Sequence, residues 1–313
     1  MTRKTPKDVA ASVRQRLQNI PGLRQDFQYV LIRYATERLL YRLSASPHRD
    51  RFVLKGALLF ALWSGLQARP TRDADLLGYG ESSPAEIEAL FRQVCAIECP
   101  EDGLRFALES VHATEIREAG EYSGVRVTAD AFLGRARVAI QVDVGFGDAV
   151  VPAPVEVTFP TLLDLPPPIL RAYSREGVVA EKLEAMLKLG VSTSRMKDFY
   201  DVYVLARDFP FGGRTLSQSI AATLERRHTA PPSETPETLT DAFAENPTKQ
   251  AQWRAFVQRL ETKDRDPPLS DVVRAIRGFV GPPMESLAVG APFEGAWPPG
   301  GPWRKRESEE DAS

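Results

Sequence analysis

The alternation of apolar and polar residues between positions 104 and 146 constrains the fold most, because it requires a β-sheet. LRFALESVHATEIRE, YSGVRVTADAFL and RARVAIQVDVGF all alternate in this way, and glycines mark the predicted turns. The last segment places four apolar side chains on one face: Val138, Ile140, Val142 and Val144. Asp143 lies on the opposite, polar face of the same predicted strand.

Helical patterns precede and follow this region, so an α+β fold is expected. Residues 6–18 and 25–44 are predicted to be helices, and LKGALLFALWSGL is apolar nearly all round, which is typical of a central helix. SPAEIEALFRQVCAI is predicted to be a helix that begins near Ser83. Further helices are expected at EGVVAEKLEAMLKLG, MKDFYDVYVLARDF, residues 214–228 and QAQWRAFVQRLETK.

Proline content marks the expected domain boundaries. Residues 1–150 are predicted to form the mixed domain with the N-terminal helices, and the proline-rich residues 151–170 a linker. Residues 171–281 are predicted to form a helical C-terminal domain. The composition of residues 282–313 indicates an unordered tail, with Trp297 and Trp303 as candidate docking points.

Composition excludes several classes of protein. The 313 residues are 43% hydrophobic and 26% charged, which is ordinary for a globular protein with a core, and the net charge of −2 indicates no general affinity for nucleic acid. Cys95 and Cys99, with only three histidines, make a poor zinc site. The chain has neither a signal peptide nor a run of about 18 apolar residues, so a cytoplasmic protein without membrane segments is expected.

The stretch RPTRDADLL, residues 69–77, is the first candidate for chemistry. Asp73 and Asp75 would share one face of a short strand and repel each other unless a positive charge lies nearby. Together with Asp143 they offer oxygen ligands, which suit Mg²⁺ better than zinc. A role of the acidic pair in a turn or a helix cap is the structural alternative. Upstream, the small residue in Lys55-Gly56-Ala57 lets phosphate approach backbone N–H groups.

The sequence resembles the AbiEii/AbiGii nucleotidyltransferase toxins of type IV toxin–antitoxin systems, including the mycobacterial MenT enzymes. The resemblance spans roughly residues 25–210. Its motifs, in the expected order, are FVLKGALLFAL, RPTRDADLL, VAIQVDVGFGD and VVAEKLEAML followed by RMKDFYDVYVLA. This family belongs to the DNA polymerase β-like superfamily, so the resemblance implies a polymerase β-like nucleotidyltransferase domain followed by a helical domain.

The resemblance also implies roles for individual residues. Asp73 and Asp75 match the family's acidic pair, and Asp143 matches the third carboxylate of the superfamily. These three acids would hold Mg²⁺ or Mn²⁺. The expected catalytic residues are Asp73, Asp75, Asp143, Lys182 and Asp198. The residues expected to bind the nucleotide are Lys55, Gly56, Thr71, Arg72 and Lys182, with Thr71 where the family often has serine.

Some of these side chains also have structural interpretations. Lys182 would then pair with Glu181 or Glu184 on a helix surface, and Asp198 with Arg195 or Lys197. For Asp201, support of the active site and a purely structural role are equally favoured interpretations.

The activity implied by the resemblance is transfer of a nucleoside monophosphate from an NTP to an acceptor hydroxyl, which arrests growth. The acceptor implied is the 3′ end of tRNA, and a neighbouring gene would encode an antitoxin that need not contact the toxin. Basic residues at 38–51 and 224–229 give weak support for RNA contacts, and a solvated helix face explains them nearly as well. The alternatives are a nucleotidyltransferase that modifies a protein or a small molecule, and a non-catalytic module that binds nucleotide or RNA.

Overall fold

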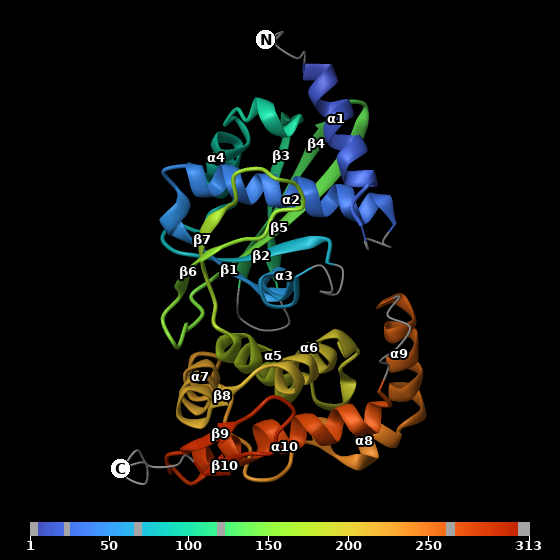
Figure 1. Ribbon diagram of the computed structural model, residues 1–313. Coiled ribbons are helices and arrows are strands. Elements are labelled where there is room, and N and C mark those ends of the chain that lie inside the picture. The colour runs from blue at the N-terminus through green and yellow to red at the C-terminus, as the bar shows by residue number, and fades with distance from the viewer. Residues whose placement is uncertain (1–5, 22–25, 66–70, 118–122, 261–266, 306–313) are drawn as a thin grey trace, which may run out of the picture. The chain divides into compact units, whose positions relative to one another are not determined.

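The computed structural model describes residues 6–21, 26–65, 71–117, 123–260 and 267–305. The chain divides into two compact units (Figure 1). Unit 1 comprises residues 1–148 and 154–173, and unit 2 comprises residues 149–153 and 174–313. The expected linker is therefore mostly part of unit 1. Its prolines flank two short strands, the outer of which lies at a sheet edge, where proline is tolerated.

Unit 1 contains a mixed seven-stranded sheet with the order β3-β4-β5-β2-β1-β7-β6. Its strands are β1 Phe52–Lys55, β2 Asp73–Gly78, β3 Leu104–Arg117, β4 Ser123–Leu133, β5 Ala136–Phe146, β6 Val155–Thr158 and β7 Ile169–Ala172. The β2–β5 and β1–β7 pairs are parallel, and the other pairs are antiparallel. The α+β class and the strands predicted between residues 104 and 146 are confirmed.

Four α-helices of unit 1 accompany the sheet within the described residues: α1 Pro6–Gln18, α2 Phe27–Ala45, α3 Leu59–Ser64 and α4 Pro84–Cys95. Asp26 and Ser83 cap α2 and α4 through side-chain oxygens that accept backbone N–H groups. α2 packs against β5 and β7, and α4 packs against β3 (Figure 1). The segment predicted as one apolar helix begins instead as β1, and α3 follows only after Gly56 leaves the strand with φ +70°.

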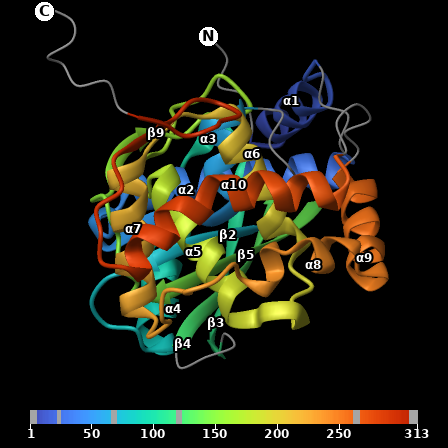
Figure 2. The same cartoon turned by 90° about the horizontal axis from the view of Figure 1, so that it is seen from below.

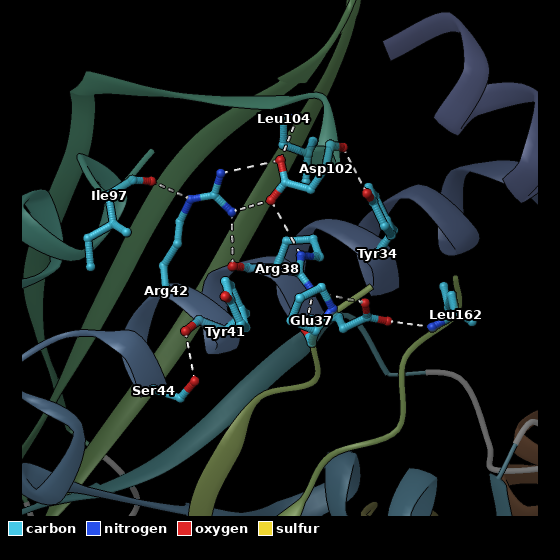
Figure 3. A network of polar contacts seen from close by, with 11 residues as sticks. Tyr34, Glu37, Arg38, Tyr41, Arg42, Ser44, Ile97, Asp102, Leu104 and Leu162 are labelled. Atoms are coloured by element: carbon cyan, nitrogen blue, oxygen red, sulfur yellow. Dashed lines mark hydrogen bonds and ion pairs between the residues drawn. The ribbon is translucent and has the colours of Figure 1, made fainter. Parts of the chain in front are cut away.

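A buried ion network joins α2 to the segment before β3 (Figure 3). Arg42 donates to Asp102 at 2.6 Å, and Arg38 donates to the same carboxylate at 3.4 Å. All three side chains are almost completely buried. The backbone carbonyl of Asp102 also accepts the Tyr34 hydroxyl at 2.8 Å. The sequence pattern did not indicate this network, which ties α2 to the sheet.

The network corrects the prediction that the basic residues at 38–51 contact RNA phosphates. Arg38 and Arg42 are buried and bound to Asp102, so RNA cannot reach them. Arg49 and Arg51 form ion pairs with Glu156 and Glu86. The charges of this segment are therefore largely engaged inside unit 1.

Unit 2 is mainly helical and has a small three-stranded sheet. Its α-helices in the described part of the chain are α5 Arg175–Leu189, α6 Met196–Asp208, α7 Gly213–Arg226, α8 Asp241–Glu245, α9 Pro247–Val257 and α10 Leu269–Ala288. Its strands are β8 Phe211–Gly212, β9 Gly295–Trp297 and β10 Arg304–Lys305, in the order β10-β9-β8. α10 packs against α6, α7 and α8 (Figure 2).

The C-terminal end of unit 2 differs from the expected unordered tail. α10 continues through Pro282 and Pro283, and residues 295–297 and 304–305 form β9 and β10. Proline cannot donate to the carbonyl four residues earlier, so Pro283 leaves the Phe279 carbonyl without its usual helical partner. The Trp303 indole Nε1–H donates to that carbonyl at 2.8 Å. The expected tail is thus ordered up to residue 305, and residues 306–313 lie outside the described part.

Both tryptophans dock within unit 2. Trp297 is buried and donates from Nε1 to the Ala206 carbonyl at 2.7 Å. Its ring lies 5.0 Å from the Phe279 ring and 5.4 Å from the Trp303 ring, between ring centroids.

Among the described residues, no helix is both long enough and apolar enough to span a membrane.

Candidate functional site

Strands β2 and β5 bring the three predicted carboxylates to one face of the sheet. Asp73 and Asp75 alternate with the buried Ala74 and Leu76, so both acids face away from the core. In the parallel pairing of the two strands, Asp75 is the direct partner of Asp143. The face that carries these carboxylates is called the acid face below.

Arg126 on β4 completes this arrangement. It is the direct partner of Asp143 in the antiparallel β4–β5 pair, so the two side chains lie on the same face. Its Nε and one terminal nitrogen donate to the two carboxylate oxygens of Asp143, both at 2.8 Å. Gln141 donates to the same oxygens at 3.3 and 3.2 Å. Both oxygens of Asp143 therefore accept hydrogen bonds from neighbours on the sheet.

The electrostatics of Arg126 show that it interacts with all three acids. Its pKa is raised above the usual value, first by the hydrogen bond to Asp143 and then by the negative charges of Asp143, Asp73 and Asp75, against the effect of burial. Arg126 is thus a positive charge on the acid face that interacts with the acidic pair. Sequence reasoning missed it, although VRV in β4 already places Arg126 on the polar face.

Gly56 makes room for Asp75. Gly56 has a φ of +70°, and a Cβ at this position would lie 2.1 Å from Oδ2 of Asp75. A side chain at position 56 would therefore displace the carboxylate and strain the backbone as well. The predicted glycine and the predicted acid are in contact.

Lys55 also lies on the acid face, as the direct partner of Asp75 in the β1–β2 pair. Its ammonium donates to Asp148 at 2.6 Å and lies 5.8 Å from the centre of the Tyr173 ring. Asp148 follows β5 and was not predicted. Its side chain is 10% exposed, and the ion pair fixes the end of Lys55 close to the acid face.

Thr71 and Arg72 precede β2 and have local partners. The Thr71 hydroxyl donates to the Asp73 carbonyl at 3.3 Å. Arg72 donates to the Tyr29 hydroxyl at 2.8 Å, and its guanidinium lies 4.7 Å from the centre of that ring. Arg72 is exposed and remains accessible to a ligand.

The remaining predicted residues assemble in unit 2, where α5 and α6 pack together. The Lys182 ammonium lies 2.9 Å from Oδ1 of Asp198 and 2.7 Å from Oδ2 of Asp201. Both aspartates are almost completely buried, and Lys182 is 11% exposed. Arg195 donates to the second oxygen of Asp198 at 2.6 Å. This group of side chains is called the lysine cluster below.

The lysine cluster contains the Asp198–Arg195 ion pair that the structural interpretation of Asp198 expected, and it joins Lys182 to the same carboxylate. Burial alone would raise the pKa of Asp198, but the charges of Lys182 and Arg195 hold it below its usual value. Lys182 pairs with Asp198 and Asp201 and not with Glu184, which accepts from Arg227 at 2.8 Å. Arg227 also belongs to the basic segment 224–229, so one charge of that segment is engaged within unit 2.

The acid face has the donor type that a hard cation prefers, because its three acids present oxygen atoms only. Among the described residues, however, no group of three or more His, Cys, Asp or Glu side chains is arranged so that it could hold a metal ion. At Asp143 both carboxylate oxygens accept hydrogen bonds from Arg126 and Gln141. Asp143 would have to exchange Arg126 for a cation before it could act as a ligand.

The family model of the AbiEii nucleotidyl transferase toxins of type IV toxin–antitoxin systems matches residues 38–275. This match covers most of the chain, including the acid face and the lysine cluster. The chain belongs to this family, and the predicted family is confirmed. By family it is a nucleotidyltransferase toxin of a type IV toxin–antitoxin system, which implies an NTP substrate and an antitoxin.

Two solved structures from Helicobacter pylori resemble the fold. One is a candidate nucleotidyltransferase with 14% identity and a TM-score of 0.49, covering 85% of this chain and 98% of its own. The other is JHP933, with 12% identity and a TM-score of 0.48, covering 84% and 94%. No curated protein matches the chain.

Proposed function

We propose that the chain is a polymerase β-like enzyme that transfers a nucleoside monophosphate from an NTP to the 3′-terminal hydroxyl of tRNA. The observation that supports this proposal best is the placement of Asp73, Asp75 and Asp143 on one face of adjacent strands, with Gly56 leaving room for Asp75. Carboxylates on neighbouring strands can hold the two metal ions that catalyse phosphoryl transfer.

Asp73 and Asp75 would hold Mg²⁺ or Mn²⁺, and Asp143 would join them after releasing Arg126. The cation would neutralise the triphosphate and lower the pKa of the attacking hydroxyl. The acceptor oxygen forms a bond to the α-phosphorus, the bond to the bridging oxygen breaks, and pyrophosphate leaves. The hydroxyl proton passes to the Asp143 carboxylate.

Cationic residues would bind the triphosphate. Lys182 is proposed to contact phosphate oxygens as a point charge, with Asp198 holding it in place through their 2.9 Å ion pair. On unit 1, Lys55, Gly56, Thr71 and Arg72 are the proposed contacts. Exposure of Arg72 supports its role.

The tRNA acceptor in this proposal comes from the family resemblance. Burial of Arg38 and Arg42 removes one of the two basic segments that favoured RNA. Transfer to a protein or a small molecule and a non-catalytic binding role are the alternatives. The protein is proposed to be cytoplasmic. A neighbouring gene is proposed to encode an antitoxin, which need not contact this protein.

The purified protein should be incubated with each labelled NTP, Mg²⁺, and either total RNA or total protein. Label is expected in tRNA, and removal of Mg²⁺ by a chelator should abolish it. Asp75→Asn and Asp143→Asn should each abolish transfer, whereas Asp130→Asn, the control for Asp143, should not. Asp130 is a matched control because it also lies in the sheet, is 19% exposed against 20% for Asp143, and also pairs with one arginine, Arg137.

Label in protein or in a small molecule would change the acceptor but keep the chemistry. Absence of label from every acceptor would refute the catalytic proposal. Undiminished transfer by Asp75→Asn would refute the site.

A further inference from the structure

The pairing of Arg126 with Asp143 has the geometry of a cation held at a ligand position. The guanidinium contacts both oxygens of the carboxylate at 2.8 Å, which is the bidentate geometry that arginine forms with carboxylates. The same carboxylate is the strand partner of Asp75. Arg126 therefore lies beside the position from which a divalent cation would be held.

The charge balance of the acid face explains why a cation is needed there. Three carboxylates on adjacent strands raise one another's energy unless a positive charge is near. The charges of Asp73 and Asp75 act on Arg126 in addition to that of Asp143. Without a metal ion, Arg126 reduces the repulsion among them.

We propose that Arg126 is a positioning residue that acts as the built-in counter-ion of Asp143 and competes with the divalent cation for this carboxylate. This inference rests on the proposed function, because it takes Asp73, Asp75 and Asp143 as the ligands. In the protein without a bound cation, Arg126 would then offset part of the negative charge of the three carboxylates. A divalent cation would bind by displacing Arg126 from Asp143. A fixed positive charge beside the ligands also weakens the affinity for any cation.

A second arginine between the same strands allows the counter-ion role to be separated from a structural one. Arg137 on β5 lies 2.9 Å from Asp130 on β4, so it also links these two strands through an ion pair. Its pKa is raised by Asp130 alone among the acids, whereas Asp73, Asp75 and Asp143 all act on Arg126. Loss of a strand-linking ion pair is common to both, but Arg126 is the direct strand partner of Asp143, whereas Arg137 lies near the other end of β5.

The test is the affinity of the protein alone for Mn²⁺, measured from the electron paramagnetic resonance signal of free Mn²⁺. Arg126→Gln is expected to bind Mn²⁺ about 3- to 30-fold more tightly than the wild type, because a partly exposed positive charge is removed from the site. Arg126→Lys keeps the charge but not the bidentate contact, so a smaller gain is expected. Arg137→Gln should leave the affinity unchanged, and Asp75→Asn should lose at least tenfold.

Thermal unfolding in the presence of a chelator provides the second readout. Arg126→Gln should unfold at a lower temperature than the wild type without metal, and Mn²⁺ should raise its midpoint more than that of the wild type. If Arg126→Gln does not fold, Arg126→Lys carries the test with its smaller expected gain.

An Arg126 variant that binds Mn²⁺ as the wild type does, or more weakly, while Asp75→Asn loses affinity, would overturn the inference and leave the proposed metal site standing. Undiminished Mn²⁺ binding by Asp75→Asn would refute the metal site itself, and the counter-ion role with it. Tighter binding by both Arg126→Gln and Arg137→Gln would show a general charge effect and would also overturn the inference.

Discussion

Gly56 and Asp75 touch so closely that a methyl group at position 56 would occupy the place of the carboxylate. A Cβ on Gly56 would lie 2.1 Å from Oδ2 of Asp75, far inside van der Waals contact. The two residues come from different parts of the sequence, yet each limits what the other can be.

Gly56→Ala is therefore expected to abolish nucleotide transfer and to destabilise unit 1. Gly65→Ala is the matched control, because Gly65 has a φ of +60° but no atom of the described residues within 4 Å of its Cβ position. Both variants should lose about 1–3 kcal/mol of unfolding free energy through backbone strain. Only Gly56→Ala should lose transfer, and equal activities of the two variants would contradict the role of this contact.

Lys182→Met is expected to destabilise the protein as well as to impair activity. It removes a cation from two carboxylates that are 1% and 0% exposed, which typically costs about 3–5 kcal/mol. Denaturant unfolding of Lys182→Met, Asp201→Asn and the double variant measures this coupling. The double variant should be more stable than Lys182→Met, because it has one buried charge fewer.

Nucleotide affinity has to be measured on a variant that folds. Lys182→Arg serves this purpose because it keeps the positive charge beside Asp198 and Asp201. If Lys182 binds phosphate, Lys182→Arg should keep most of the NTP-dependent rise in melting temperature, whereas Lys182→Met should lose it. Equal rises in both folded variants would limit Lys182 to a structural role.

The stability of the protein is expected to fall as the pH rises from about 4.5 to about 7. The pKa of Glu37 is raised from 4.5 to about 7, mainly because burial disfavours its charged form (Figure 3). The folded state therefore holds a proton that the unfolded chain releases, so the stabilisation is complete below the unfolded pKa and is lost as the pH passes the folded pKa.

Glu37→Gln should remove this pH dependence and should stabilise the protein at pH 8 by on the order of 2–4 kcal/mol. The amide oxygen can still accept from the Leu162 N–H, which bonds to Glu37 at 2.7 Å. Glu101→Gln, at an exposed position near the same network, is the control and should keep the wild-type pH profile. A profile of Glu37→Gln that matches the wild type would contradict the assignment.

Trp303→Phe is expected to destabilise unit 2 by about 1–3 kcal/mol, since it leaves the Phe279 carbonyl without the indole donor. Pro283→Ala returns an N–H that can donate to the same carbonyl. The cost of Trp303→Phe should therefore be smaller in the Pro283→Ala background. Additive effects in this double-mutant cycle, followed by denaturant unfolding, would show that the two groups do not serve one carbonyl.

Local patterns in the sequence predicted the features that depend on backbone periodicity. The two-residue repeat of a strand placed Asp73 and Asp75 on one face and Asp143 on the polar face of β5, and the structure agrees. Ser83 as the cap of α4 is equally local. The family motifs added the family, which the family match confirms.

The unpredicted features depend on register or on packing between distant segments. The partner of Asp143 follows from the β4–β5 register, which the turn at Gly134 sets, so the sequence showed an arginine on a polar face but not which acid it meets. The basic pattern at 38–51 could not reveal Asp102, whose buried carboxylate binds Arg38 and Arg42.

The same reason applies to the C-terminal end. Six prolines and several glycines indicated disorder there, because each disfavours a helix locally. The tertiary structure outweighs that preference, since Trp303 supplies the donor that Pro283 lacks and the aromatic rings bury one another. Side-chain periodicity is a property of the chain itself, whereas the choice of partner is a property of the fold, and it was decided only when distant residues came together.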